Sequence, residues 1–117
     1  MKKEIVWPRG CQSAAMICVM LDAEFIWLSM DAQRYDTPKH RSMGEYGPLR
    51  GVDRILDALN RFHAKATFFT PGIFAEAYPD TVKKIVQAGH EIALHGHHHE
   101  DFATLSPEEQ RAVIRQG

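Results

Sequence analysis

Short apolar segments alternate along the chain with segments of helical periodicity. Residues 14–21 form an unbroken apolar run of strand length. Continuous rather than alternating hydrophobicity is typical of a strand that is covered on both faces, as in parallel α/β sheets. Two further segments, residues 65–70 and 91–94, also have the length and composition of strands. The pattern therefore predicts three strands.

The segments between and after these strands predict helices. Apolar residues recur at helical spacing from Gly51 to His63, which indicates an amphipathic helix. Asp80 is expected to cap a second helix that Gly89 ends. The stretch 106–109, Ser-Pro-Glu-Glu, has the form of a capping box that begins a third helix. Strands that alternate with helices through right-handed crossovers predict an α/β fold with a parallel sheet.

Residues 23–50 connect the first strand to the first of these helices. Over residues 25–48, prolines and glycines interrupt any regular pattern, so we expect an irregular loop. A connection of this length in a small domain is usually functional or disordered, and its aromatic side chains argue against disorder. The segment is interpreted as either a substrate-facing lid or a loop packed over one end of a barrel.

Composition narrows the classes of partner and compartment. The chain has 117 residues, 44% apolar and 25% charged, with a net charge of −1, as expected for one small globular domain. Lys and Arg do not cluster, so neither nucleic acid nor a membrane surface is an expected partner. The start, Met1–Glu4, is not followed by the apolar stretch of a signal peptide. Cys11 and Cys18 are expected to be reduced thiols, and we expect a cytoplasmic protein.

Four of the seven histidines lie in the stretch His95-Gly96-His97-His98-His99, directly after the third predicted strand. Histidine is the commonest metal-ligating side chain. His95 and His99 can reach one ion if the turn between them is tight, and Gly96 tolerates the backbone angles of such a turn. The alternative is a polar loop in which histidines cluster by chance. A metal site requires a third ligand from elsewhere in the chain.

Asp22 supplies that candidate ligand. Asp22, Thr70 and His95 follow or end the three predicted strands, and the carboxyl ends of parallel strands meet at one edge of a sheet. Two histidines and one carboxylate leave coordination positions open, which is typical of catalytic rather than structural metal sites. Taken singly, Asp22 is also a plausible turn or capping residue, and Glu24 is expected to face solvent.

Five stretches together resemble a known family. They are Leu21-Asp22-Ala23-Glu24, Tyr46-Gly47-Pro48, Lys65-Ala66-Thr67-Phe68-Phe69, Ala88-Gly89-His90-Glu91-Ile92, and His95-Gly96-His97-His98-His99-Glu100. The chain resembles the amino-terminal part of the polysaccharide deacetylase family, also called the NodB-homology or carbohydrate esterase family 4 fold. Within it, the resemblance is to a cytoplasmic branch with peptidoglycan-deacetylase-like, cyclic imide hydrolase-like and allantoinase-like members. It implies a partial (β/α) barrel with parallel strands.

The resemblance also implies a site and a reaction. Asp22, His95 and His99 match the positions of the family's metal ligands, so a divalent metal is expected, with zinc first and iron, cobalt or nickel as alternatives. The family hydrolyses an amide or imide C–N bond, typically in the N-acetyl group of an amino sugar. Tyr46 and Thr70 are candidate substrate contacts. His97 and His98 match no ligand position and are expected to support the ligands or to face solvent.

Two departures from the family pattern affect the expected activity. Where the branch usually carries the general base, as the first aspartate of Asp-x-Asp-Ala-Glu, this chain has Met20. A thioether cannot take a proton from water, and Glu24 is the nearest substitute base. The chain also ends at Gly117, without matches to the later motifs, including an arginine-bearing loop and a late histidine that serves as general acid. We therefore expect one truncated domain, residues 1–117, whose carboxyl-terminal barrel half is absent.

Two functions remain open at this point. The first is a metal-dependent hydrolase of non-peptide C–N bonds, impaired in this chain, that acts on an N-acetylated sugar or a small cyclic imide or amide. The second is a catalytically inactive relative that keeps the fold and acts by binding or oligomerisation. Three parallel strands leave an edge unpaired, so a second copy, or a longer chain of which this is a fragment, is expected to cover it.

Overall fold

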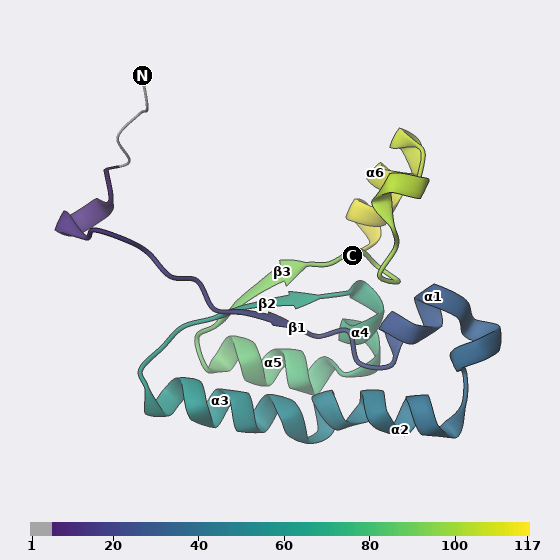
Figure 1. The fold of residues 1–117 in the computed structure, drawn as a ribbon, viewed down its shortest axis with the longest axis horizontal. Helices are drawn as coiled ribbons and strands as arrows, with labels where there is room; N and C mark the ends of the chain where they lie inside the picture. Colours follow the sequence, from purple (N-terminus) through teal and green to yellow (C-terminus); the bar gives the residue numbers. More distant parts are fainter. Residues whose placement is uncertain (1–5) are drawn as a thin grey trace.

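The computed structural model of this chain describes residues 6–117, so the start Met1–Glu4 lies outside the described residues. Its centre is a three-stranded sheet of β1 (Cys18–Met20), β2 (Thr67–Thr70) and β3 (Glu91–Leu94), in the spatial order β1-β2-β3 (Figure 1). Both strand pairs are parallel. The predicted α/β fold with parallel strands is therefore confirmed.

Helices connect and follow the strands. They are α1 (Phe25–Tyr35), α2 (Pro38–Tyr46), α3 (Val52–Arg61), α4 (Gly72–Ala77), α5 (Pro79–Gln87) and α6 (Pro107–Gln116), with short helical turns at Pro8–Gly10, Gly47–Gly51 and Phe102–Thr104. Within residues 6–117, no helix combines the length and apolar character needed to cross a bilayer.

The core lies between the sheet and the helices on one of its faces. Val19, Phe68 and Ile92 are register partners, and partners in register point to the same face of a sheet. Phe68 is fully buried in a cluster with Phe74 of α4 and Ile85 of α5. In Figure 1 the helices α2, α3 and α5 run along this side of the sheet. The core thus holds β2 at the centre of the fold.

The other face of the sheet differs from the prediction. Met20, Phe69 and Ala93 are register partners on this face, and Met20 is 53% exposed. Within the described residues, the buried cluster packs on the opposite side of the sheet, so the expectation of strands covered on both faces is wrong here. The first strand is also shorter than residues 14–21, because only Cys18–Met20 pairs with β2.

The predicted irregular loop over residues 25–48 is wrong, because this segment contains α1 and α2. Pro38 occupies the first turn of α2, where its missing N–H and fixed φ favour a helix start. Thr37 caps that start, since its hydroxyl accepts the backbone N–H of His40. Gly44 lies inside α2 at a close backbone approach to Glu24. Pro38 thus starts the helix α2, and Gly44 allows it to pack closely against Glu24.

Asp80 does not cap its helix. The helix α5 begins at Pro79, with Tyr78 at the capping position, and Asp80 lies in the first turn, where a negative charge is favourable to the helix dipole. The helix α4, which precedes it, was not predicted. The expected end is confirmed, since Gly89 follows α5 with a φ of +76°. The capping box of Ser106 and Glu109 is also present at the start of α6.

Phe68 offers a direct test of the core. Replacing Phe68 with alanine removes a fully buried ring from the central strand, and we expect a loss of about 3–5 kcal/mol in the free energy of unfolding. Urea denaturation followed by circular dichroism measures it. Phe62→Ala is the matched control, because Phe62 is 76% exposed and surface changes usually stay within about 0.5 kcal/mol. Equal losses in the two variants would contradict this assignment of the core.

Candidate metal centre

The ends of β1 and β3 bring Asp22 and His95 to the same edge of the sheet. The ladders continue one residue past the strands, because Leu21 N–H donates to Phe69 O at 2.9 Å and His95 N–H donates to Thr70 O at 3.2 Å. Since β2 lies between β1 and β3, the two flanking strands are about 10 Å apart, twice the usual strand spacing of about 4.8 Å. The side chains of Asp22 and His95 bridge this gap above the end of β2.

His99 reaches the same point through a tight loop. Gly96 has a φ of +71° and His99 a φ of +62°, so the backbone turns back within five residues, as the position of Gly96 predicted. The Glu100 carboxylate closes this loop by accepting the backbone N–H groups of His97, at 2.8 Å, and His98, at 2.9 Å. Glu100 thereby holds His99 in a backbone conformation that residues other than glycine rarely adopt.

The backbone hydrogen bonds that Glu100 accepts also lower the pKa of its carboxyl group. Burial tends to raise the pKa of Glu100, but hydrogen bonds from the backbone N–H groups of His98, Glu100 and His97 outweigh it and hold the pKa below its usual value. The carboxylate therefore stays ionised, which is the form that accepts both bonds. This role was not foreseen from the sequence, although a carboxylate one residue after His99 is the signal that could have indicated it.

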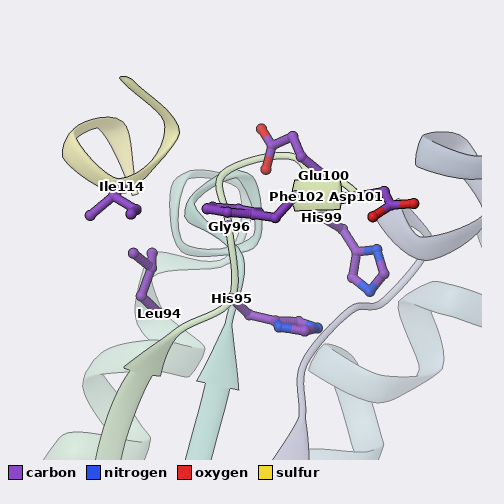
Figure 2. A pocket seen from close by; sticks show the side chains of 8 residues that line it. All are labelled: Leu94, His95, Gly96, His99, Glu100, Asp101, Phe102 and Ile114. Carbon is purple, nitrogen blue, oxygen red and sulfur yellow. The ribbon is translucent and has the colours of Figure 1, made fainter. Parts of the chain in front are cut away.

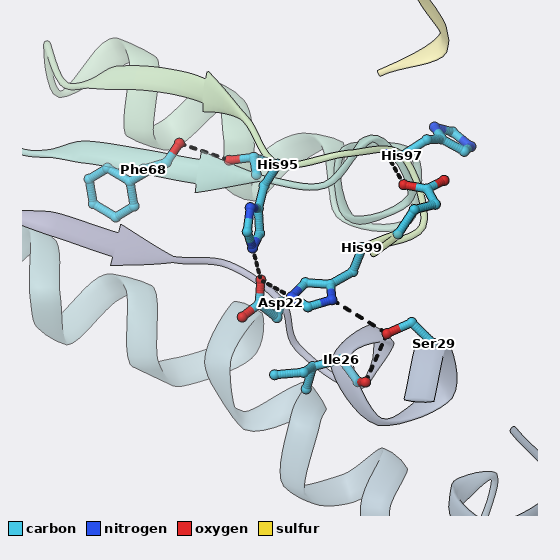
Figure 3. Close-up of polar contacts among 9 residues, drawn as sticks. Asp22, Ile26, Ser29, Phe68, His95, His97 and His99 are labelled. Atoms are coloured by element: carbon cyan, nitrogen blue, oxygen red, sulfur yellow. Dashed lines mark hydrogen bonds and ion pairs between the residues drawn. The ribbon is translucent and has the colours of Figure 1, made fainter. Parts of the chain in front are cut away.

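Asp22, His95 and His99 converge in the structure. One ligand atom from each lies within 4.8 Å of the others, and Figure 3 shows both imidazole rings directed at the Asp22 carboxylate. Asp22 Oδ1 is 3.5 Å from His95 Nε2 and 4.0 Å from His99 Nε2. These distances exceed those of a good hydrogen bond. The grouping that the strand polarity predicted is thus present in the structure.

Asp22 Oδ1 is the exceptional atom of the cluster. It is buried and has no hydrogen-bond partner among residues 6–117. A buried carboxylate oxygen without a donor is unfavourable in a protein interior, and two imidazole nitrogens face it. A cation between the three side chains would satisfy the oxygen and both nitrogen lone pairs at once. One carboxylate and two neutral imidazoles are a common donor set for zinc and other divalent transition metals.

Ser29 on α1 contacts the far side of the His99 ring. Its hydroxyl donates to Ile26 O at 2.9 Å, and its Oγ lies 3.4 Å from His99 Nδ1 (Figure 3). With that hydroxyl proton committed to Ile26, Oγ is an acceptor for a proton on Nδ1, which leaves the Nε2 lone pair free towards Asp22. Such contacts select the tautomer of metal-binding histidines. The sequence motifs do not indicate Ser29, because an irregular loop over residues 25–48 would place no side chain at a defined position, whereas the structure places Ser29 on α1.

Glu24 does not face solvent, contrary to expectation. It is only 7% exposed, and both of its carboxylate oxygens accept a hydrogen bond from the Tyr78 hydroxyl, at 3.0 and 3.2 Å. Burial, this hydrogen bond to Glu24, and the negative charges of Glu24 and Glu45 raise the pKa of Tyr78 to about 12. The two residues are 54 positions apart in the sequence, which is why periodicity could not pair them.

The remaining predicted residues lie as follows. Thr70 is 4% exposed and its hydroxyl donates to Phe68 O, so it lies beneath the site rather than at its surface. Tyr46, at the end of α2, is half exposed, and its hydroxyl accepts a hydrogen bond from Arg54. A contact of either residue with substrate stays a prediction. His97 is buried, whereas His98 is exposed, and the expectation that neither is a ligand stays a prediction.

A hollow of about 410 Å³ adjoins the cluster (Figure 2). Its lining includes His95 and His99 together with Gly96 and Glu100 of the histidine loop, while Leu94, Asp101, Phe102 and Ile114 complete it. Two candidate ligands form part of its wall, so the hollow lies beside the cluster.

The chain has relatives of known family. A family model described as polysaccharide deacetylase matches residues 43–117, a range that contains His95 and His99 and begins after Asp22. The chain is 32% identical over 96 residues to the peptidoglycan deacetylase of Helicobacter pylori, covering 82% of this chain and 32% of that protein. The chain spans about a third of the length of the curated relatives it matches.

Solved structures agree with this likeness. The crystal structure of a polysaccharide deacetylase-family protein from Mycobacterium smegmatis superposes with a TM-score of 0.91 and 36% identity, covering 96% of this chain and 39% of that one. The crystal structure of Puue allantoinase superposes with a TM-score of 0.64 and 31% identity, covering 68% of this chain and 26% of that one. The resemblance predicted from the motifs is thereby confirmed.

The buried contact of Tyr78 predicts an effect of pH. Its pKa is raised above the unfolded value of about 10, so the contact stabilises the fold fully below pH 10, and this contribution is lost as the pH rises towards about 12. The tyrosinate absorbance of the native chain, minus that of Tyr78→Phe, should therefore show a step centred near pH 12. A difference curve centred near pH 10 would contradict this contact.

Proposed function

The chain belongs to the polysaccharide deacetylase family, and from that premise we propose that Asp22, His95 and His99 hold a divalent metal ion in a hydrolase of non-peptide C–N bonds. The single observation that carries this proposal is the buried Asp22 Oδ1, which has no hydrogen-bond partner among residues 6–117 and faces two imidazole nitrogens. Zinc is the first candidate, and iron, cobalt or nickel would suit the same ligands.

Each residue of the proposed metal centre would have its own role. Asp22 contributes the negative charge, and His95 and His99 contribute neutral lone pairs, so three protein ligands leave room for substrate. Ser29 keeps the proton of His99 on Nδ1, at a contact of 3.4 Å, and Glu100 keeps the loop closed. A bound metal supplies Lewis-acid polarisation of the substrate carbonyl and lowers the pKa of water. The hollow beside His95 and His99 would receive the substrate.

The names of the relatives support a choice of substrate class. The Helicobacter pylori relative is named a peptidoglycan deacetylase, and one of the similar solved structures is named Puue allantoinase. Hydrolysis of an acetamide and of a cyclic amide both break a C–N bond at a carbonyl. We propose an N-acetylated amino sugar as the first substrate, with a small cyclic imide or amide as the alternative. Because the relatives are about three times as long, this activity is proposed for the chain within a longer or multimeric protein, and its cytoplasmic location remains a proposal.

Met20 favours a second candidate function. It ends β1, two residues before Asp22, and 53% of its surface is exposed. At the position where the family resemblance expects the general base, its thioether offers no group that accepts a proton from water. The alternative proposal is an inactive relative that binds metal or ligand without turnover. The two candidates share the metal centre and differ in the proton acceptor.

Metal binding is tested by calorimetric titration of the metal-free chain with zinc. We expect one site per chain, and an affinity that falls by at least about 100-fold in Asp22→Ala, His95→Ala and His99→Ala, since even partners of the ligands cost 10–100-fold. His98→Ala is the matched control, because His98 lies in the same loop and is exposed; its affinity should not change. Absence of binding, or binding that Asp22→Ala leaves intact, would contradict the proposed centre.

The base is tested by Met20→Asp, with Met20→Asn as a control of the same size that cannot take a proton. If the chain is a hydrolase impaired at this position, Met20→Asp should raise the rate of acetate release from an N-acetylglucosamine oligosaccharide by roughly 10²–10⁴-fold, the usual contribution of a general base, and Met20→Asn should not. No release by any of the three proteins, with zinc bound, would favour the inactive relative. Equal release by all three would contradict the role assigned to position 20.

A further inference from the structure

The turn that presents Asp22 has an unusual backbone. Ala23, which follows Asp22, has a φ of +50°, in a region that residues with a side chain rarely adopt. The turn is closed by Phe25 N–H, which donates to Asp22 O at 3.0 Å, and α1 begins at Phe25. Such a conformation persists only where surrounding contacts hold it, so the contacts of the residues around Ala23 matter for this turn.

Glu24 makes the contacts that hold this turn on one side. Its carboxylate is buried and receives the Tyr78 hydroxyl at 3.0 and 3.2 Å. Tyr78 lies at the junction of α4 and α5, and its ring is 5.1 Å from that of the fully buried Phe74. Through Tyr78, Glu24 is therefore connected to the buried core around Phe74.

The helix α2 holds the turn on its other side. Gly44 approaches so closely that a Cβ at this position would overlap the backbone nitrogen and Cα of Glu24. The backbone of Glu24 is thus packed against α2 while its side chain is bonded to Tyr78. Tyr78 and the helix α2 thus both contact Glu24, which lies two positions after the candidate ligand Asp22.

We propose that Glu24 is a positioning residue, which holds the turn from Asp22 to Phe25 so that the Asp22 carboxylate is directed at His95 and His99. This inference rests on the proposed metal centre, because Glu24 is proposed to direct one of its ligands. The role requires no proton transfer by Glu24. The hydrogen bond from Tyr78 requires an acceptor at position 24 and does not require a negative charge. Glutamine at this position should therefore preserve the geometry, whereas alanine should not.

The experiment compares four variants of the 117-residue chain by zinc calorimetry and by amide hydrogen exchange of Phe25 in the metal-free state. Glu24→Ala and Tyr78→Phe should each weaken zinc affinity by roughly 10-fold or more and accelerate exchange of the Phe25 amide. Glu24→Gln should keep both values within about 3-fold of the parent chain, since its amide oxygen accepts the same bond. Tyr46→Phe is the matched control, because it removes a tyrosine hydroxyl that bonds to Arg54 at the surface.

The outcomes separate this inference from the proposed function. If Glu24→Ala and Tyr78→Phe fold and keep the zinc affinity of the parent chain, the positioning role is wrong while the metal centre stands. If Glu24→Gln loses affinity as far as Glu24→Ala does, the charge of Glu24 matters rather than its bond, and the inference is again overturned. If the parent chain binds no zinc, the metal centre fails, and exchange of the Phe25 amide still decides whether Glu24 and Tyr78 hold the turn. Should Glu24→Ala not fold, Tyr78→Phe carries the test.

Discussion

Two backbone hydrogen bonds lie just past the ends of the strands, from Leu21 N–H to Phe69 O and from His95 N–H to Thr70 O. They extend the parallel ladders by one residue on each side of β2, so that Asp22 and His95 leave the sheet at the same height. All else at the site depends on this register. A slip of one residue on either flanking strand would turn its ligand to the opposite face of the sheet, where the core lies.

The loops that carry the ligands are held in uncommon conformations by two glutamate carboxylates, of which Glu24 is buried and Glu100 is partly exposed. Ala23 and His99 both have positive φ values, and each lies next to a glutamate with a defined partner. Glu100 accepts two backbone N–H groups inside the histidine loop, whereas Glu24 bonds to Tyr78 across the fold. One end of the cluster is therefore held by a local interaction and the other by a tertiary one. The contact of Glu100 is therefore easier to predict from sequence than the contact of Glu24, because its partners lie only a few residues away.

Prediction succeeded where the deciding forces are local. The capping box of Ser106 and Glu109 and the left-handed Gly89 follow from short-range backbone chemistry, and both are present. Prediction failed over residues 25–48, because Pro38 and Gly44 break helices in one context and serve them in another. Whether Gly44 interrupts α2 or lets it approach Glu24 depends on what lies opposite, and that is decided only when the chain has folded.

The sequence by itself determined the alternation of strands and helices, the shared polarity of the strands, and hence the meeting of Asp22, His95 and His99. Those features arise from periodicity and from the handedness of crossovers, which act over short stretches of chain. Only the tertiary structure decided that Glu24 is buried against Tyr78, that Ser29 contacts His99, and that one face of the sheet carries the core. Glu24 and Tyr78 are 54 positions apart in the sequence, and Ser29 and His99 are 70 positions apart. The energies of such contacts depend on burial, which no local pattern encodes.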